Sequence, residues 1–145
     1  MTIDFRPDEG ATEFVIEQLK AFNDSSHPLI AEQRQNPSDP VALQAFAREG
    51  DRVVGAVLAR AAITWQWLEI SIVWVDEEFR GKGIGTLLMN EIEEMGRRHG
   101  CTRAKVSSWE FQAPGFYEKR GYVVYGVLDN YPEGVRDFML WKSLA

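Results

Sequence analysis

The stretch Arg80-Gly81-Lys82-Gly83-Ile84-Gly85 decides the fold, because it joins an apolar run to an amphipathic one. Residues 68–75 before it predict a strand, and residues 86–99 after it predict a helix. Glycines let a ligand approach the backbone and leave several N–H groups free, and the start of a helix adds positive partial charge at the same point. The stretch therefore predicts an anion site, for which a phosphate group is the natural ligand.

This loop lacks the features of two common nucleotide-binding motifs. A dinucleotide-binding fingerprint needs a third glycine where this chain has Thr86. A P-loop needs Gly-Lys-Ser/Thr after a four-residue spacer, and the chain has no such run. The pattern Arg-x-x-Gly-x-Gly, from Arg80 to Gly85, resembles instead that of the GNAT superfamily of acyl-CoA-dependent N-acetyltransferases. The resemblance implies that the loop binds the pyrophosphate of coenzyme A.

A second motif follows at residues 113–122, Ala-Pro-Gly-Phe-Tyr-Glu-Lys-Arg-Gly-Tyr. It resembles the short helix and turn that come after the fifth strand in the same superfamily. The order of elements is similar from about residue 3 to about residue 142, and motif-level similarity spans about residues 67–125. The resemblance implies an α/β (α+β) fold with a single GNAT-like N-acetyltransferase domain over residues 1–145. Its central sheet is expected to be mixed and mostly antiparallel, with about six or seven strands, flanked by helices and splayed at the central strands.

Hydrophobic periodicity indicates the elements around the two motifs. Residues 23–40 contain Pro28, Pro37 and Pro40 and show little periodicity, so a loop with one helical turn is expected there, bordering the acceptor site. Helices are expected at residues 13–22, 86–99 and 113–119, and Gly100 is the expected end of the second. Strands are expected at residues 3–5, 41–48, 52–63, 67–75, 103–109, 122–128 and 136–142.

Alternation within the central strand, residues 67–75, predicts one core face and one face with polar groups. In the helix that follows, Glu93 with Arg97 and Glu94 with Arg98 have the four-residue spacing of ion pairs, and both pairs are expected on the solvent side. The expected core face of the strand carries Leu68, Ile70, Ile72 and Trp74, and the other face carries Trp67, Glu69, Ser71, Val73 and Val75.

Composition is typical of one small enzyme domain. The chain has 145 residues, 45% of them hydrophobic, which is enough for one substantial core. Its single cysteine, Cys101, allows no internal disulfide, and neither this cysteine nor the isolated His27 and His99 have the spacing of a metal site. We therefore expect no metal and a reducing, cytoplasmic location.

Charge and hydropathy exclude two classes of partner. The formal net charge of −6 argues against non-specific nucleic-acid binding, which depends on dense lysine and arginine. The N-terminal residues lack a basic region followed by an apolar run, and no later segment is apolar for long enough to span a membrane. We expect a protein that binds neither nucleic acid nor membranes.

The resemblance implies acetyl-CoA as a co-substrate and assigns residues to its binding. In the superfamily, the central strand offers backbone N–H groups to the thioester and the pantetheine arm. Glu110 stands where many members carry an asparagine that contacts this arm, so Gln112 is the expected substitute, while Lys119 approaches from the short helix. The expected coenzyme-binding residues are Val73, Trp74, Val75, Arg80, Gly81, Lys82, Gly83, Ile84, Gly85, Thr86, Gln112 and Lys119.

Two side chains are candidates for the chemistry, which needs a neutral amine and a proton for the departing thiolate. Tyr117 matches the family tyrosine near the coenzyme sulfur, where a phenol donates that proton; the alternative is a core aromatic beside Phe116 whose hydroxyl bonds a backbone carbonyl. Glu69 matches the position of a general base in some members; alternatively, it orients a cationic acceptor or pairs with an arginine. Ser71 lies on the same strand face and is a candidate for positioning the acceptor.

The sequence thus predicts an N-acetyltransferase that moves an acetyl group from acetyl-CoA to a primary amine by direct attack. One alternative is a non-catalytic domain that binds or senses acyl-CoA, and another is a nucleotide-binding α/β module, which preferential binding of ATP or NAD would favour. A small amine, a polyamine, an aminoglycoside-like compound and a protein amine all stay open as acceptors. A homodimer is compatible with the implied fold.

Overall fold

The structure is a computed structural model that describes the whole chain, residues 1–145. These residues form two compact units, 1–37 and 38–145. The first unit consists of two helices, α1 (Glu9–Ser26) and α2 (Pro28–Gln35). The second unit contains the sheet, the other helices and both sequence motifs.

Capping side chains fix the beginnings of both helices of the first unit. Asp8 comes just before α1, which starts at Glu9, and its carboxylate accepts a hydrogen bond from the Ala11 N–H at 2.9 Å. His27 ends α1, and its ring nitrogen accepts from the Leu29 N–H at 3.3 Å to cap α2. Pro28 is the first residue of α2, where its missing N–H costs nothing.

Two expectations for the N-terminal third were wrong. Residues 3–5 form no strand, because no other strand pairs with them; Asp4 instead pairs locally with Arg6. The segment 23–40 is not a loop with one helical turn, because α1 continues to residue 26 and α2 occupies residues 28–35. Proline was taken as a helix breaker, whereas Pro28 starts a helix.

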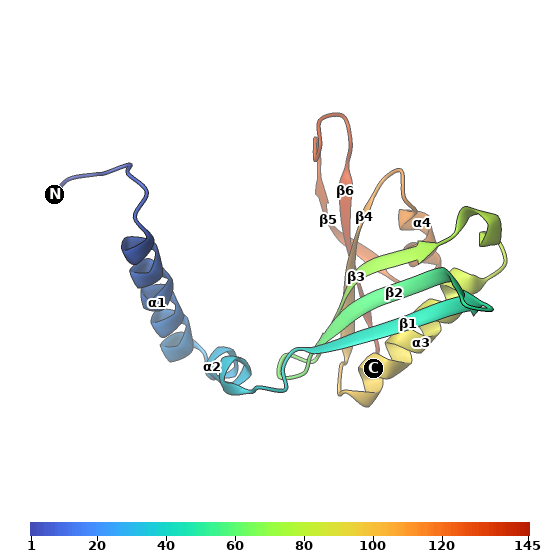
Figure 1. Cartoon of the computed structure of the whole chain (residues 1–145), viewed down its shortest axis with the longest axis horizontal. Coiled ribbons are helices and arrows are strands. Elements are labelled where there is room, and N and C mark those ends of the chain that lie inside the picture. Colours follow the sequence, from blue (N-terminus) through green and yellow to red (C-terminus); the bar gives the residue numbers. More distant parts are fainter. The chain divides into compact units, whose positions relative to one another are not determined.

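The second unit is built on a mixed sheet of six strands in the order β1-β2-β3-β4-β6-β5. Every neighbouring pair is antiparallel except β3 and β4, which are parallel (Figure 1). The arrangement confirms the expected fold class. The strands are β1 (Val41–Glu49), β2 (Arg52–Ala62), β3 (Trp67–Val75), β4 (Arg103–Trp109), β5 (Val123–Leu128) and β6 (Asp137–Ser143), and the helical elements are η1 (Glu77–Phe79), α3 (Ile84–Arg98) and α4 (Pro114–Lys119).

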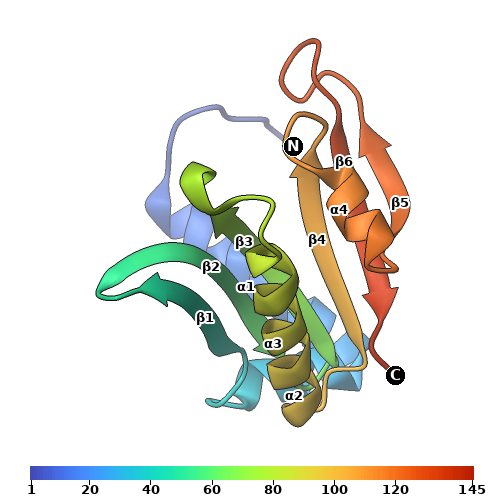
Figure 2. The same ribbon diagram turned by 90° about the vertical axis from the view of Figure 1, so that its right-hand side faces the viewer.

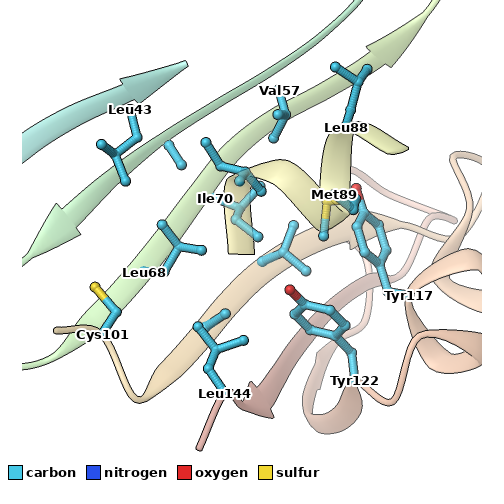
Figure 3. Close-up of a cluster of buried hydrophobic side chains, with 14 of the residues drawn as sticks. Leu43, Val57, Leu68, Ile70, Leu88, Met89, Cys101, Tyr117, Tyr122 and Leu144 are labelled. Carbon is cyan, nitrogen blue, oxygen red and sulfur yellow. The ribbon is translucent and has the colours of Figure 1, made fainter. Parts of the chain in front are cut away.

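Helix α3 covers one face of the sheet and forms the core with it (Figure 2). Its residues Leu88, Met89 and Ile92 are buried against Leu68 of β3 and Leu140 of β6. Figure 3 shows Leu68, Leu88 and Met89 within this cluster of buried side chains. The helix ends as expected before Gly100, whose φ of +84° suits a residue without a side chain. None of the helices combines the length and hydropathy needed to cross a bilayer.

The central strands splay apart, as expected. Strands β3 and β4 pair only over their first three residues, from Trp67 with Arg103 to Glu69 with Lys105. Beyond these pairs the two strands diverge (Figure 2). The edge of β3 that faces β4 therefore has no strand partner beyond Ile70.

A β-bulge interrupts the alternation of β3 at Ser71. Leu58 of β2 pairs with Ile72, and the next residue, Ala59, pairs with Ile70, so Ser71 is an extra residue without a partner. The Ser71 hydroxyl donates to the Leu58 carbonyl at 3.0 Å. Because a bulge shifts the strand by one residue, the side chains beyond it change faces.

The bulge makes the expected faces of β3 wrong beyond residue 70. Ile72 and Trp74, assigned to the core face, are 51% and 43% exposed. Val73 and Val75, assigned to the polar face, pack against the core. Leu68 and Ile70, which precede the bulge, are buried as expected.

The placement of Glu93 on the solvent side of α3 was also wrong. Glu93 is 3% exposed, and its carboxylate accepts hydrogen bonds from Arg120, Tyr122 and Lys142. The four-residue spacing does bring Arg97 within 4.0 Å of the Glu93 carboxylate as an ion pair, but the hydrogen-bond partners of Glu93 come from distant parts of the sequence.

Candidate active site

The splay opens a cleft of about 800 Å³ between the ends of β3 and β4. The glycine-rich loop before α3 lines one part of it, and the start of α4 lines another. Both sequence motifs therefore contribute to one cavity. Of the residues expected to bind coenzyme, those that line it are Val73, Trp74, Val75, Arg80, Gly81, Gly83, Ile84, Gly85, Thr86 and Gln112.

The loop presents unpaired N–H groups to the cleft. The first hydrogen bond of α3 runs from the Leu87 N–H to the Gly83 carbonyl at 3.1 Å, so the N–H groups of Ile84, Gly85 and Thr86 have no partner within the helix. No side chain caps this end of α3. The N–H groups and the positive end of the helix dipole together suit an anion such as a pyrophosphate.

Two glycines of the loop have backbone conformations that exclude most other residues. Gly81 and Gly83 have φ of +76° and +81°, and a Cβ at either position would meet open space. Glycine is therefore required there by the backbone angle and not by crowding inside the protein. The open space next to the loop is where a ligand can approach the main chain.

Gly85 brings the two motifs into contact. A Cβ at this position would lie 3.4 Å from Cζ of Phe116, so α4 packs closely on the first turn of α3. Tyr117, the next residue of α4, lines the same cleft as the loop. The close packing thus sets the distance between the anion site and the tyrosine.

The three basic candidates differ in their relation to the cleft. Arg80 lines it, and its Nε donates to the Val75 carbonyl at 3.0 Å, which fixes the side chain at the end of β3. Lys82 does not line the cleft, and its ammonium lies 5.0 Å from the centre of the Phe79 ring. Lys119 is exposed and does not line it either.

Tyr117 combines burial with access to the cleft. It is 8% exposed, and its ring lies edge-on to those of Phe116 and Tyr122, with centroids 5.2 and 5.8 Å away. Burial raises the pKa of its phenol. The group therefore stays protonated at neutral pH, which is the state that a proton donor needs.

Glu69 lies near the point where β3 and β4 separate but does not line the cleft. Its Oε2 accepts hydrogen bonds from Nε and Nη2 of Arg60, at 3.0 and 2.8 Å. The side chain is 17% exposed, while that of Arg60 is 60% exposed. Sequence reasoning had allowed for an arginine partner without naming it, because the pair joins β2 to β3 across the sheet.

Gln112 lines the cleft, while Glu110 does not. The side-chain oxygen of Gln112 accepts from the Trp109 N–H at 2.9 Å, so Gln112 closes the turn after β4. Glu110 instead pairs with Arg136 at 3.2 Å, and the hydrogen bonds from Arg136 lower the pKa of the Glu110 carboxyl. Glu110, which stands where the family pattern has an asparagine, thus has its charge compensated by Arg136 outside the cleft.

Sequence reasoning missed several residues on the β4 side of the cleft. Ser107, Ser108 and Phe111 line it, with Ser108 buried and Phe111 67% exposed. The signal that could have found them is the parallel pairing of β3 with β4, because parallel strands end at the same edge of a sheet.

Comparison with known proteins assigns the chain to a family. Residues 8–122 match the model of the acetyltransferase (GNAT) family. The chain belongs to the GNAT family of acetyltransferases. The expected family and the expected enzyme class, a GNAT-type acyltransferase, are therefore confirmed.

Relatives of this GNAT protein span nearly its whole length. It is 33% identical over 133 residues to a blasticidin-S acetyltransferase of Streptomyces morookaense, covering 88% of this chain and 96% of that protein. The crystal structure of an acetyltransferase from Bacillus cereus is similar with a TM-score of 0.78 and 26% identity, covering 98% of this chain and 97% of the other.

A solved structure of the same fold contains coenzyme A, the carrier part of the expected co-substrate. An aminoglycoside 6'-N-acetyltransferase was crystallised with coenzyme A; it matches with a TM-score of 0.65 and 21% identity, covering 80% of this chain and 78% of that one. At this identity the match shows a shared fold. In this GNAT protein the glycine loop lies at the start of α3, where free N–H groups could donate hydrogen bonds to the phosphates of coenzyme A.

Proposed function

We propose that this GNAT protein transfers an acetyl group from acetyl-CoA to a primary amine, by direct attack of the amine on the thioester carbonyl. The observation that carries the proposal is one cleft lined both by the glycine-rich loop at the start of α3 and by the buried Tyr117. A phosphate-bearing acyl donor and a proton for its leaving group are the two needs of this reaction.

The loop and β3 would hold the donor. The N–H groups at the start of α3 bind the pyrophosphate, and Arg80, fixed by the Val75 carbonyl, adds a charged hydrogen bond. Val73 and Val75 have backbone groups on the side that β4 has left, which can bond the amides of the pantetheine arm. Bound acetyl-CoA supplies the activated acyl group.

Tyr117 and Glu69 would carry the protons. The Tyr117 hydroxyl donates its proton to the departing sulfur as the C–S bond breaks and the C–N bond forms, and the proton that the new amide nitrogen then loses restores the Tyr117 hydroxyl. Glu69, which Arg60 holds in place, takes the proton of the ammonium acceptor through a water molecule, since its side chain does not line the cleft. Ser71, at the bulge, lines the cleft and positions the acceptor amine.

The first acceptor to test is blasticidin S, because the relative with 33% identity is an acetyltransferase of that compound and covers nearly all of this chain. A polyamine, an aminoglycoside and a peptide with a free N-terminus complete the panel. We also propose that residues 1–145 act as one N-acetyltransferase domain, which is supported by the family match over residues 8–122. A homodimer and a cytoplasmic location stay predictions.

The proposal is tested by titration calorimetry with acetyl-CoA, with ATP and NAD as controls, followed by thiol release against the panel. Binding of acetyl-CoA with thiol release is the expected result. Binding without release from any amine would favour the alternative, a domain that senses acyl-CoA. Preferential binding of ATP or NAD would contradict the assignment of the loop.

Tyr117→Phe tests the role of the tyrosine within the same reaction. The phenylalanine keeps the ring contacts but has no proton to give, so we expect binding of acetyl-CoA to be nearly normal and kcat to fall about 100-fold. Unchanged kcat would remove the proton-donor role. Tyr131→Phe is the matched control, since Tyr131 is 57% exposed and does not line the cleft.

A further inference from the structure

A buried carboxylate on α3 has no part in the reaction described above. Glu93 is 3% exposed and does not line the cleft. Burying a charge is unfavourable unless partners compensate it, and replacing a whole buried ion-pair network with apolar side chains often leaves stability unchanged. A buried carboxylate with several partners therefore suggests that it holds those partners in fixed positions.

The partners of Glu93 come from two separate stretches of the chain. Its Oε1 accepts from the Tyr122 hydroxyl at 3.0 Å and from Nη2 of Arg120 at 3.2 Å. Its Oε2 accepts from Nζ of Lys142 at 3.0 Å. Arg120 caps the end of α4, Tyr122 precedes β5, and Lys142 belongs to β6. One carboxylate thus ties α3 to both ends of the segment that follows α4.

Two of these partners also hold Tyr117 by their main chain. The N–H groups of Arg120 and Tyr122 both donate to the Tyr117 carbonyl, each at 3.0 Å. The same two residues donate to Glu93 with their side chains. Arg120 and Tyr122 therefore each connect Glu93 to Tyr117 directly.

The rings complete the connection. The Tyr122 ring lies edge-on to that of Tyr117, with centroids 5.8 Å apart, and the two side chains lie next to each other in the core (Figure 3). Burial and the carboxylate of Glu93 raise the pKa of Tyr122, so its hydroxyl remains a donor. Its bond to Glu93 fixes the ring against which Tyr117 packs.

We propose that Glu93 is a positioning residue that, through Arg120 and Tyr122, holds the Tyr117 hydroxyl at a set place relative to the loop at the start of α3. The inference rests on the proposed role of Tyr117. Glu93 and the anion-binding loop belong to one helix, so the rigid helix fixes the tyrosine and the coenzyme phosphates in the same frame. Glu93 itself touches no substrate.

A double-mutant cycle separates positioning from simple stabilisation. Tyr122→Phe keeps the ring and removes one hydrogen bond, while Arg120 and Lys142 still compensate the charge of Glu93. We expect kcat to fall about tenfold with the KM for acetyl-CoA within about twofold, because misplacement affects the transferred proton and not phosphate binding. In a Tyr117→Phe background the same change should alter kcat by less than about twofold.

The kinetic outcomes are distinct. If Tyr122→Phe lowered kcat by the same factor in the Tyr117→Phe background as in the parent protein, the inference would be overturned. Such a result would mean that Tyr122→Phe acts on the structure in general and not through the Tyr117 hydroxyl. If Tyr117→Phe alone leaves kcat unchanged, the proton-donor role in the proposed function fails, and the spectroscopic comparison that follows then decides the positioning claim by itself.

A readout without substrate uses fluorine NMR of protein labelled with 3-fluorotyrosine, in which single Tyr→Phe variants assign the four tyrosine signals. We expect one sharp Tyr117 signal in the parent protein, and a shifted or broadened one in Tyr122→Phe and in Glu93→Gln. Glu91→Gln, at an exposed glutamate of the same helix, is the control and should leave the signal unchanged. A Tyr117 signal that is unchanged in both network variants, with the protein still folded by thermal melting, would overturn the inference.

Discussion

The two halves of β3 have similar compositions but opposite surroundings. Residues 67–70 pair with β2 and begin alongside β4, and Leu68 and Ile70 are buried under α3. Residues 72–75 pair with β2 alone, Ser71 is unpaired at the bulge, and all five residues line the cleft, where Ile72 and Trp74 are exposed. The bulge at Ser71 and the departure of β4 separate the halves. The first half belongs to the core, and the second offers its backbone to a ligand.

Truncating one apolar side chain in each half gives the largest contrast in stability. Leu68 is fully buried, so Leu68→Ala should lower the free energy of unfolding by about 2–5 kcal/mol. Ile72 is 51% exposed, so Ile72→Ala should change it by no more than about 0.5 kcal/mol. Urea denaturation of the two variants measures the difference. Equal losses would mean that the second half is as tightly packed as the first.

The glycine loop gives the second contrast, between two positions with the same backbone strain. Gly83 and Gly50 both have positive φ and open space around a Cβ, but only Gly83 lines the cleft. Valine at either position should strain the chain similarly. Gly83→Val should also weaken acetyl-CoA binding by more than about 100-fold, because it moves the N–H groups at the helix start. Gly50→Val should bind normally in calorimetry, and similar losses in both would remove the loop from the site.

The comparison also explains what the sequence could predict. The first half of β3, the end of α3 and the two motifs were predicted because each depends on local chemistry: alternation along the strand, and glycine in the loop and after the helix. The bulge was not, because Ser71 looks like any polar residue on an alternating strand until the register with Leu58 is known. For the same reason Glu93 was placed on the surface, since its partners lie 27 to 49 residues away.

The candidate site followed the same division. Every loop residue expected to bind coenzyme lines the cleft except Lys82, since backbone geometry follows from glycine and the helix start. Side chains that reach across elements were less predictable: Lys119 does not line the cleft, while Ser108 and Phe111 do. Long-range packing decides those positions.

Glu69 is the last residue of β3 that pairs with β4. Replacing it tests whether the first half of β3 also takes part in the reaction. If it takes the acceptor proton through water, Glu69→Gln should lower kcat/KM about tenfold, below the roughly 100-fold typical of a directly bonded base. The pH–rate profile should lose its acid limb in the variant. A raised acceptor KM with an unchanged profile would show that Glu69 only recognises charge. Glu49→Gln, at an exposed position of β1, is the control.

The smallest effect expected is that of Lys82, and it sharpens the distinction between a side chain held at the cleft and one held beside it. Arg80 is fixed by the Val75 carbonyl at the end of β3, so Arg80→Met should weaken acetyl-CoA binding about tenfold. Lys82 lies over the Phe79 ring and outside the cleft lining, so Lys82→Met should weaken it only about two- to threefold. Both losses should shrink as salt is added, because exposed charges are screened. A loss at Lys82 as large as that at Arg80 would mean that Lys82 leaves the Phe79 ring and contacts the phosphates when acetyl-CoA binds. The loop would then reach its full set of phosphate contacts only in the complex.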